Sequence, residues 1–240
     1  MLLVFVAATK SEIAPFQSYL KDNYAMKNEF QFTKAGLDIH LLITGIGMTM
    51  TAYALTKYII QIHPDYVINL GIAGGFPASN LKIGAVVQVR KAIFGDLGIE
   101  TAEGDFKTIF ENNLADLNQF PFQKGILHNT HAPTFLNNVT ALSVNKVHGQ
   151  EAAIKKIITK FNPDIETMES GAIFYTCLSE NVPFMEIRSI SNFVEKRDKS
   201  KWNIPLALNN LTNSTIELLE LMEALHEENK RQPAGFRLDK

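Results

Sequence analysis

Apolar runs of strand length recur along the chain, and they constrain its fold more than any other feature. Leu2 to Ala8 is apolar throughout, and Tyr66 to Leu70 is a second run of this kind. Such runs are typical of strands covered on both faces. Further strands are expected at 31–32, 37–43, 82–94, 141–147 and 183–190, and helices at 150–161 and 203–225. Strands that alternate with helices predict an α/β fold, a single three-layer domain with a mixed central sheet flanked by helices.

Glycine-rich segments punctuate this pattern. Thr44 to Gly47 is expected to open a helix that runs through Ile59. Gly71 to Gly75 directly follows the strand expected at Tyr66 to Leu70. Three glycines at a strand end permit close approach of a ligand to the backbone amides, although steric needs alone also select glycine. The GxGxxG and GxxxxGK[ST] patterns are both missing from the sequence, so a dinucleotide or nucleoside triphosphate is not indicated.

Length and composition bound the remaining possibilities. The 240 residues are 46% hydrophobic with no linker-like stretch, which indicates one domain over residues 1–240 with a polar, frayed tail at 227–240. A formal net charge of −2 provides no basic surface for nucleic acid. Met1 to Ala8 is too short to span a membrane. The only cysteine, Cys177, lies in an apolar helical pattern and suits the reducing cytoplasm.

Two carboxylates stand out against the apolar pattern. Glu169 lies between a turn signal and the apolar helix expected from Ser170, and a carboxylate buried there must meet hydrogen-bond donors. Glu12 follows the first strand, next to Thr9 and Ser11, either of which would cap a helix. Each acid has a structural alternative, because the dipole at a helix start stabilises any acid in the first turn.

Other polar groups give weaker signals. His128 and His131 are three residues apart with no cysteine or acidic cluster beside them, so no metal site is expected. The region 95–138 has no clear period and predicts loops and short elements. Glu195 to Lys201 is a charge run, which usually forms a solvated loop.

Five segments in a fixed order give the chain a family resemblance. VFVAATKSE, TGIGMTMTAYAL, INLGIAGGF, TMESGAI and IRSISN resemble the nucleoside phosphorylase and nucleosidase superfamily in order and spacing. Within it, FGDLGIE and IRSISNFVEKRDKSKWNIPLAL look most like the futalosine hydrolases, which release hypoxanthine from futalosine in menaquinone biosynthesis. The resemblance implies a small nucleoside as substrate, no cofactor, no metal, and a homo-oligomer, either a dimer or a tetramer.

The resemblance also implies roles for seven residues. Glu12 would activate the attacking water as general base, and Asn192 would act on the purine. Glu169 would bind the ribose hydroxyls, with Met168 beneath the sugar. The remaining positions would line the site: Gly74 beside the nucleophile, Val147 facing the purine, and Ser191 next to Asn192. The structural alternative for Asn192 is that it satisfies backbone groups after a strand.

Three rival functions remain open. A methylthioadenosine/S-adenosylhomocysteine nucleosidase would share the same segments, but such enzymes carry Asp where this chain has Asn192. A phosphorylase would need arginines for phosphate, and the first 89 residues contain none. A nucleoside-binding protein without activity would have no need of Glu12.

Overall fold

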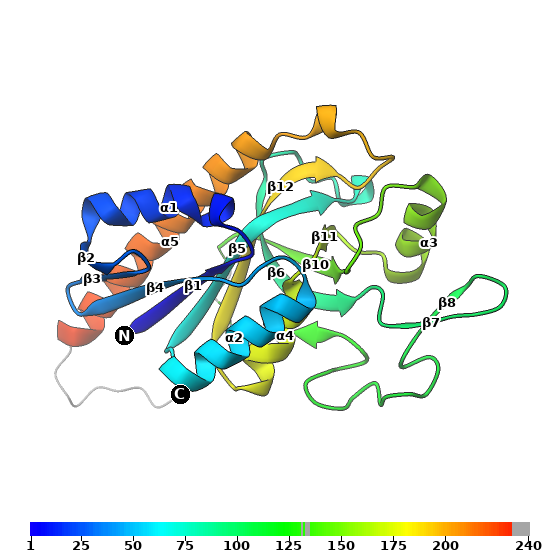
Figure 1. The fold of residues 1–240 in the computed structure, drawn as a ribbon, viewed down its shortest axis with the longest axis horizontal. Helices are drawn as coiled ribbons and strands as arrows, with labels where there is room; N and C mark the ends of the chain where they lie inside the picture. The colour runs from blue at the N-terminus through cyan, green and yellow to red at the C-terminus, as the bar shows by residue number, and fades with distance from the viewer. Residues whose placement is uncertain (131, 133–134, 232–240) are drawn as a thin grey trace.

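The first apolar run forms β1 (Leu2–Ala7) near the middle of a ten-stranded sheet in the computed structural model (Figure 1). The structure describes residues 1–130, 132 and 135–231. The helices are α1 (Lys10–Asn23), α2 (Met48–Ile62), α3 (Glu151–Phe161), α4 (Ser170–Ser179) and α5 (Ile204–Arg231), with short 3-10 turns η1 (Pro77–Ser79) and η2 (Lys199–Lys201). The strands after β1 are β2 (Ala25–Asn28), β3 (Gln31–Lys34), β4 (Leu37–Ile43), β5 (Tyr66–Gly75), β6 (Val86–Phe94), β7 (Gly98–Glu100), β8 (Phe106–Thr108), β9 (Leu127–His128), β10 (Asn137–Ser143), β11 (Ile165–Thr167) and β12 (Phe184–Phe193).

The sheet is mixed, with the order β11-β10-β6-β12-β5-β1-β4-β3-β2 and β9 added to β6. β1 lies parallel to β4 and β5, and β5 lies parallel to β12, whereas β12 and β6 are antiparallel. β11 pairs with β10 on one side and, antiparallel, with the end of β5 on the other. The strands β11, β10, β6, β12 and β5 therefore close into a ring.

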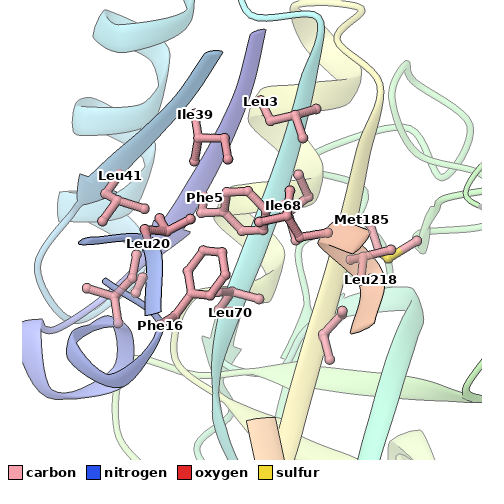
Figure 2. Close-up of a cluster of buried hydrophobic side chains, with 14 of the residues drawn as sticks. Leu3, Phe5, Phe16, Leu20, Ile39, Leu41, Ile68, Leu70, Met185 and Leu218 are labelled. Carbon is pink, nitrogen blue, oxygen red and sulfur yellow. The ribbon is translucent and has the colours of Figure 1, made fainter. Parts of the chain in front are cut away.

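Helices cover both faces of the sheet, which confirms the predicted three-layer α/β arrangement (Figure 1). On one face, α1 and α5 pack on β1, β4 and β5 through residues such as Phe16, Leu20 and Leu218 (Figure 2). On the other face, α2 and α4 contribute Leu55 and Phe174 to a second core. Cys177 of α4 is fully buried there, as a small hydrophobe.

A third, smaller core anchors α3 beside the strand ring. Ile154 and Ile157 of α3 pack with Phe76 and Val194, which lie just beyond the ends of β5 and β12. This cluster holds the segments that leave the ring close to one another. The described residues between 95 and 136 form β7, β8, β9 and turns, as the irregular sequence of this region predicts.

The structure corrects three of the expectations about element boundaries in particular. Gly71 to Gly75 is not a turn after a strand but the last part of β5, because β12 and β11 supply backbone partners as far as Gly75. The strand expected at 141–147 ends at Ser143, where its neighbours β6 and β11 also end.

The tail is the third difference. Helix α5 continues through Arg231, and Lys230 Nζ donates to the Ala35 carbonyl at 2.7 Å, which ties the end of the helix to the β3–β4 turn. Residues 227–231 are therefore helical rather than frayed. The rest of the predicted tail, residues 232–240, lies outside the described residues. In the ranges 1–130, 132 and 135–231, none of the helices combines the length and apolar character that a membrane crossing needs.

Candidate active site

One pocket of about 390 Å³ lies over the ends of β1, β5 and β12 and beside the loop that leaves β11. Its wall contains all seven residues expected for the site, namely Glu12, Gly74, Val147, Met168, Glu169, Ser191 and Asn192. The fold therefore gathers side chains that are up to 180 positions apart in the chain. Their roles remain predictions.

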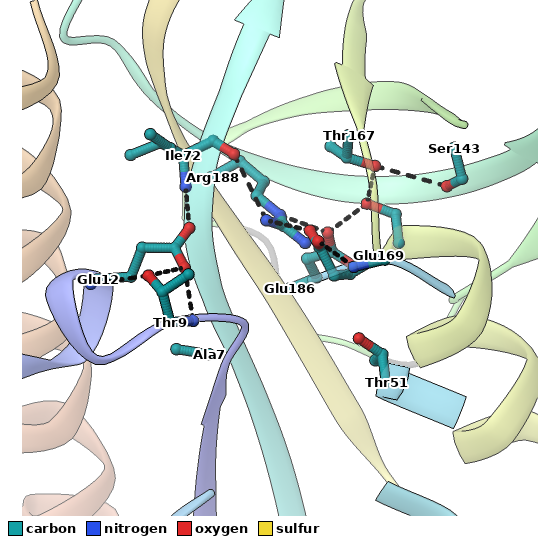
Figure 3. A network of polar contacts seen from close by, with 12 residues as sticks. Ala7, Thr9, Glu12, Thr51, Ile72, Ser143, Thr167, Glu169, Glu186 and Arg188 are labelled. Atoms are coloured by element: carbon teal, nitrogen blue, oxygen red, sulfur yellow. Dashed lines mark hydrogen bonds and ion pairs between the residues drawn. The ribbon is translucent and has the colours of Figure 1, made fainter. Parts of the chain in front are cut away.

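Glu12 is held at the start of α1 by a capping box. Its backbone N–H and the Thr9 hydroxyl are 3.4 Å apart, and its Oε2 accepts from the Thr9 amide at 3.0 Å and the Thr9 hydroxyl at 2.7 Å. Its other oxygen, Oε1, accepts from the Ile72 amide at 3.2 Å (Figure 3). Glu12 thus has the structural role considered from the sequence, and its carboxylate also reaches the pocket beside β5.

Close contacts beside the Glu12 carboxylate explain why residue 71 of β5 is a glycine. A Cβ at Gly71 would lie 2.2 Å from Arg188 Nη1 and 3.0 Å from Glu12 Oε1. Contacts this short are not compatible with a side chain, so the charged groups occupy the space that glycine leaves open. The glycine segment therefore acts through close approach within the strand, not through a turn.

Glu169 is the N-cap residue of α4, but its side chain does not cap that helix. Oε1 accepts from the backbone N–H of Gly47, at the start of α2, at 3.0 Å, and Oε2 lies 3.3 Å from Arg188 Nη1. Protein donors thus already satisfy this buried carboxylate, and ligand hydroxyls are not required to explain its burial. The helix-dipole alternative also falls short, because the carboxylate is held by α2 and β12 as well.

Arg188 is the main residue that sequence reasoning missed. Its side chain is 1% exposed and lies beneath the pocket. Nε donates to Glu186 Oε1 at 2.7 Å and Nη1 lies 3.4 Å from the Ile72 carbonyl. With the Asn69 amide turned so that its oxygen faces the guanidinium, Nη2 donates to it at 2.9 Å. The signal in the sequence was Glu186 and Arg188 at alternate positions of a strand, hence on one face.

The guanidinium lies among three carboxylates. Burial alone would lower the pKa of Arg188, but the charges of Glu186, Glu169 and Glu12 outweigh burial and raise its pKa above the ordinary value. Arg188 therefore stays protonated. The absence of arginine from the first 89 residues does not exclude Arg188, which lies on β12. Its hydrogen bonds are directed to protein groups.

A β-bulge places Ser191 and Asn192 side by side in the wall. The register between β12 and β5 shifts between Ile190 and Asn192, so that Asn192 pairs with Gly74. The Ser191 hydroxyl donates to Asn192 Oδ1 at 2.8 Å, and Asn192 Nδ2 donates to the Phe193 carbonyl at 3.0 Å. The backbone contact is the one that a purely structural role would produce, and one amide hydrogen remains for a ligand.

The opposite wall comes from the loop after β10 and the segment after β12. Val147 is 38% exposed and leaves its side chain accessible to the pocket. Arg197 and Trp202 also line the pocket, and the guanidinium carbon lies 5.1 Å from the indole centroid. Glu166 is a further buried acid in the wall that sequence reasoning missed.

A metal site requires several ligating side chains close together. Within the described ranges, no group of three or more His, Cys, Asp or Glu side chains is placed to hold a metal ion. His128 lies in β9, and His131 lies outside the described residues.

Residues 3–225 match the family described as the phosphorylase superfamily, and the chain belongs to that superfamily. The chain is 26% identical over 196 residues to futalosine hydrolase of Thermus thermophilus, covering 81% of this chain and 84% of that protein. It is 30% identical over 218 residues to 5'-methylthioadenosine/S-adenosylhomocysteine nucleosidase of Maridesulfovibrio salexigens, covering 83% and 89%. Futalosine hydrolase of Helicobacter pylori has the same fold, with a TM-score of 0.75 at 13% identity over 92% of this chain and 97% of that one. The predicted superfamily is confirmed, and both kinds of relative are N-glycosyl hydrolases.

Proposed function

We propose that the chain is a nucleosidase that hydrolyses the N-glycosidic bond of futalosine and releases hypoxanthine and dehypoxanthine futalosine. The relatives named futalosine hydrolase, at 26% and 28% identity, support this substrate, as does the resemblance of the C-terminal segments. In the proposed reaction, water attacks the anomeric carbon while the bond to the purine breaks. Positive charge develops on the sugar as the bond lengthens, and the departing purine gains electron density.

The carboxylates are suited to the sugar side of this reaction. Glu12 acts as general base toward water, because its Oε1 faces β5 and retains a lone pair beyond the contact with Ile72. Glu169 binds the ribose hydroxyls and, with Glu12, stabilises the developing oxocarbenium charge. Met168 lies next to Glu169 in the pocket wall and provides an apolar contact for the sugar.

The charges of the pocket favour water over phosphate as nucleophile. The wall contains the carboxylates of Glu12, Glu166 and Glu169 and a single guanidinium, that of Arg197. A phosphate dianion would meet three like charges, and Arg188 below is committed to Glu186, Glu169 and Asn69. The site therefore favours a hydrolase over a phosphorylase.

The presence of Asn192 in the pocket wall is the observation that supports a 6-oxopurine as the base of the substrate. A 6-oxopurine presents acceptors at N7 and O6, to which a neutral amide can donate, whereas an ionised carboxylate would repel them. Asn192 lies in the pocket wall with an amide hydrogen to spare. We therefore assign the site to hypoxanthine nucleosides.

The second candidate is an adenine-releasing methylthioadenosine/S-adenosylhomocysteine nucleosidase. The relative of that name at 30% identity is the specific observation in its favour. Such an enzyme would release adenine and would show little activity on futalosine. A nucleoside-binding protein without activity would turn over neither substrate.

We further propose that the chain works in the cytoplasm as a homo-oligomer, a dimer or tetramer. Met50, Tyr53 and Ile60 form an exposed apolar stripe on α2, with Tyr53 70% exposed, and a second copy of the chain would cover it. Sedimentation at several concentrations tests this, and a Tyr53→Glu variant should shift the distribution toward the monomer. A wild-type protein that stays monomeric at all concentrations would contradict the proposal.

The function is tested by incubating the purified protein separately with futalosine, methylthioadenosine and inosine, each with and without phosphate, and identifying the released base by chromatography. We expect hypoxanthine from futalosine at the same rate in both buffers. Release that requires phosphate would indicate a phosphorylase. Release of adenine alone would indicate the second candidate, and no release from any substrate would indicate a binding protein.

A further inference from the structure

Glu166 and Asn192 flank the same glycine on neighbouring strands. Gly74 of β5 pairs with Asn192 of β12 on one side and with Glu166 of β11 on the other. Residues paired across strands project to the same face of a sheet, and a Cβ built on Gly74 would lie 3.4 Å from Asn192 Nδ2. The nearest neighbour of such a Cβ would be Val194 Cγ2, at 2.9 Å, so the strand can carry only a glycine here. Glu166 and Asn192 therefore flank a side-chain-free position of β5 in the pocket wall.

The spacing of the strands that carry Glu166 and Asn192 suits a planar base between the two polar groups. Two strand spacings separate β11 from β12 across β5, which is about 10 Å. Glu166 and Asn192 both line the pocket, so polar groups on two sides can reach one edge of a ligand placed over Gly74.

Glu166 is held as a hydrogen-bond acceptor. It is 5% exposed, and its Oε1 accepts from the His148 backbone N–H at 3.0 Å. Its Oε2 makes a short contact with His148 Nδ1, and with a proton on Nδ1 the imidazole donates to this oxygen. A carboxylate oxygen can accept two hydrogen bonds, and each oxygen of Glu166 has one partner in His148. One acceptor position therefore remains on each oxygen for a ligand. The proposed mechanism assigns no task to this buried acid.

Resting on the proposed function, we infer that Glu166 is a base-recognition residue that accepts a hydrogen bond from N1–H of a 6-oxopurine. Along one edge, hypoxanthine presents an acceptor at N7, an acceptor at O6 and a donor at N1. Asn192 supplies a donor for the first two groups and Glu166 supplies an acceptor for the third. Along the same edge adenine presents an acceptor at N7, a donor at the 6-amino group and an acceptor at N1, so its N1 lone pair would face the carboxylate of Glu166.

A structural role is the alternative, because the contacts with His148 also pin the loop that carries Val147. The two roles differ in what they do to different bases. A loop anchor affects every purine alike, whereas an N1–H acceptor affects only purines with a proton at N1. Glu166→Gln separates them, since glutamine keeps an acceptor for the His148 amide and replaces one carboxylate oxygen with a donor.

The test is calorimetric binding of three free bases: hypoxanthine, 1-methylhypoxanthine and adenine. We expect wild-type protein to bind hypoxanthine about 10- to 100-fold more tightly than 1-methylhypoxanthine, the range for a hydrogen bond to a charged group. Glu166→Gln should lose this preference and bind adenine more tightly than wild type does. His148→Ala should weaken all three bases by a similar factor, and Glu103→Gln, an exposed acid with the same change of charge, should alter none.

Equal binding of hypoxanthine and 1-methylhypoxanthine by wild-type protein would overturn the inference without any variant. Equal weakening of all bases by Glu166→Gln would overturn it in favour of the loop anchor. Base binding does not depend on turnover, so the two proposals fail separately. Base preference without hydrolysis of futalosine would refute the proposed function alone, and hydrolysis with no effect of Glu166→Gln on base preference would refute this inference alone.

Discussion

Glu169 Oε2 lies 3.3 Å from Arg188 Nη1, and this contact joins the start of α4 to the middle of β12 (Figure 3). Both side chains are buried, and Glu186 holds the same guanidinium from its other side. The position of Glu169 is therefore set before any ligand arrives. A carboxylate that is already oriented can interact with developing charge without reorganising.

We expect Glu169→Gln to lower kcat as well as raise KM, because the lost charge matters most when the sugar is positively charged. Removing one member of a buried ion pair also costs stability, so unfolding by denaturant should be measured beside steady-state kinetics. Glu180→Gln, an exposed acid at the other end of α4, is the matched control. A variant of normal fold whose defect is confined to KM would contradict this role.

Glu12→Gln should lower kcat by about 100-fold or more, since general bases contribute roughly 10² to 10⁴. Glutamine can keep acceptor contacts in the capping box, and the loss of a cap costs only about 1 kcal/mol, so the folded state should survive. Thr9→Ala serves as control, because it weakens the cap but leaves the carboxylate. Full activity of Glu12→Gln would remove Glu12 from the mechanism.

Asn192→Asp should lose activity toward futalosine and narrow or partly invert the preference over its 6-amino counterpart. The reason is that a carboxylate repels O6, whereas a protonated Asp can donate to N7 of adenine and its ionised form can accept from the 6-amino group. The measurement is kcat/KM for both nucleosides in both proteins, with Asn209→Asp on the exposed side of α5 as control. An unchanged ratio would exclude Asn192 from base recognition.

Arg197→Ala should raise KM for futalosine by up to about fivefold, and added salt should reduce the difference, as for an exposed ion pair. Arg197 lines the pocket, stacks on Trp202 and has no carboxylate within ion-pairing distance among the described residues, so it is available to the carboxylate of the substrate. Of the two cations Arg197 and Lys199 in the charge run Glu195 to Lys201, only Arg197 lies in the pocket wall. KM values that do not respond to Arg197→Ala or to salt would place the carboxylate elsewhere.

Local patterns predicted much of the fold because each depends on neighbours in sequence. The apolar run of β1 and the Thr9 cap before Glu12 are examples, and Glu169 was correctly expected at the start of a helix. The start of the tail was predicted to be frayed because its residues are polar. It is helical, and Lys230 contacts the Ala35 carbonyl, which is almost 200 residues away in sequence and so gives no local signal.

The missed parts of the site depend on pairing between distant strands. Arg188 lies beside the Ile72 carbonyl and Glu169, below the pocket, only because β12 lies next to β5. Glu166 borders it only because β11 turns back antiparallel to the end of β5, which neither segment indicates on its own. A strand of three residues carries too little periodicity to reveal its partners, so the relation of Glu166 to Asn192 required the structure.

The most direct measurement of the central claim is a competition in one phosphate-free reaction that contains equal concentrations of futalosine and methylthioadenosine. The initial ratio of hypoxanthine to adenine equals the ratio of the two kcat/KM values, which is the quantity that defines specificity. We expect hypoxanthine to exceed adenine by about 100-fold or more, because a site built on buried hydrogen bonds discriminates at least this strongly. Adenine in excess of hypoxanthine would contradict the account.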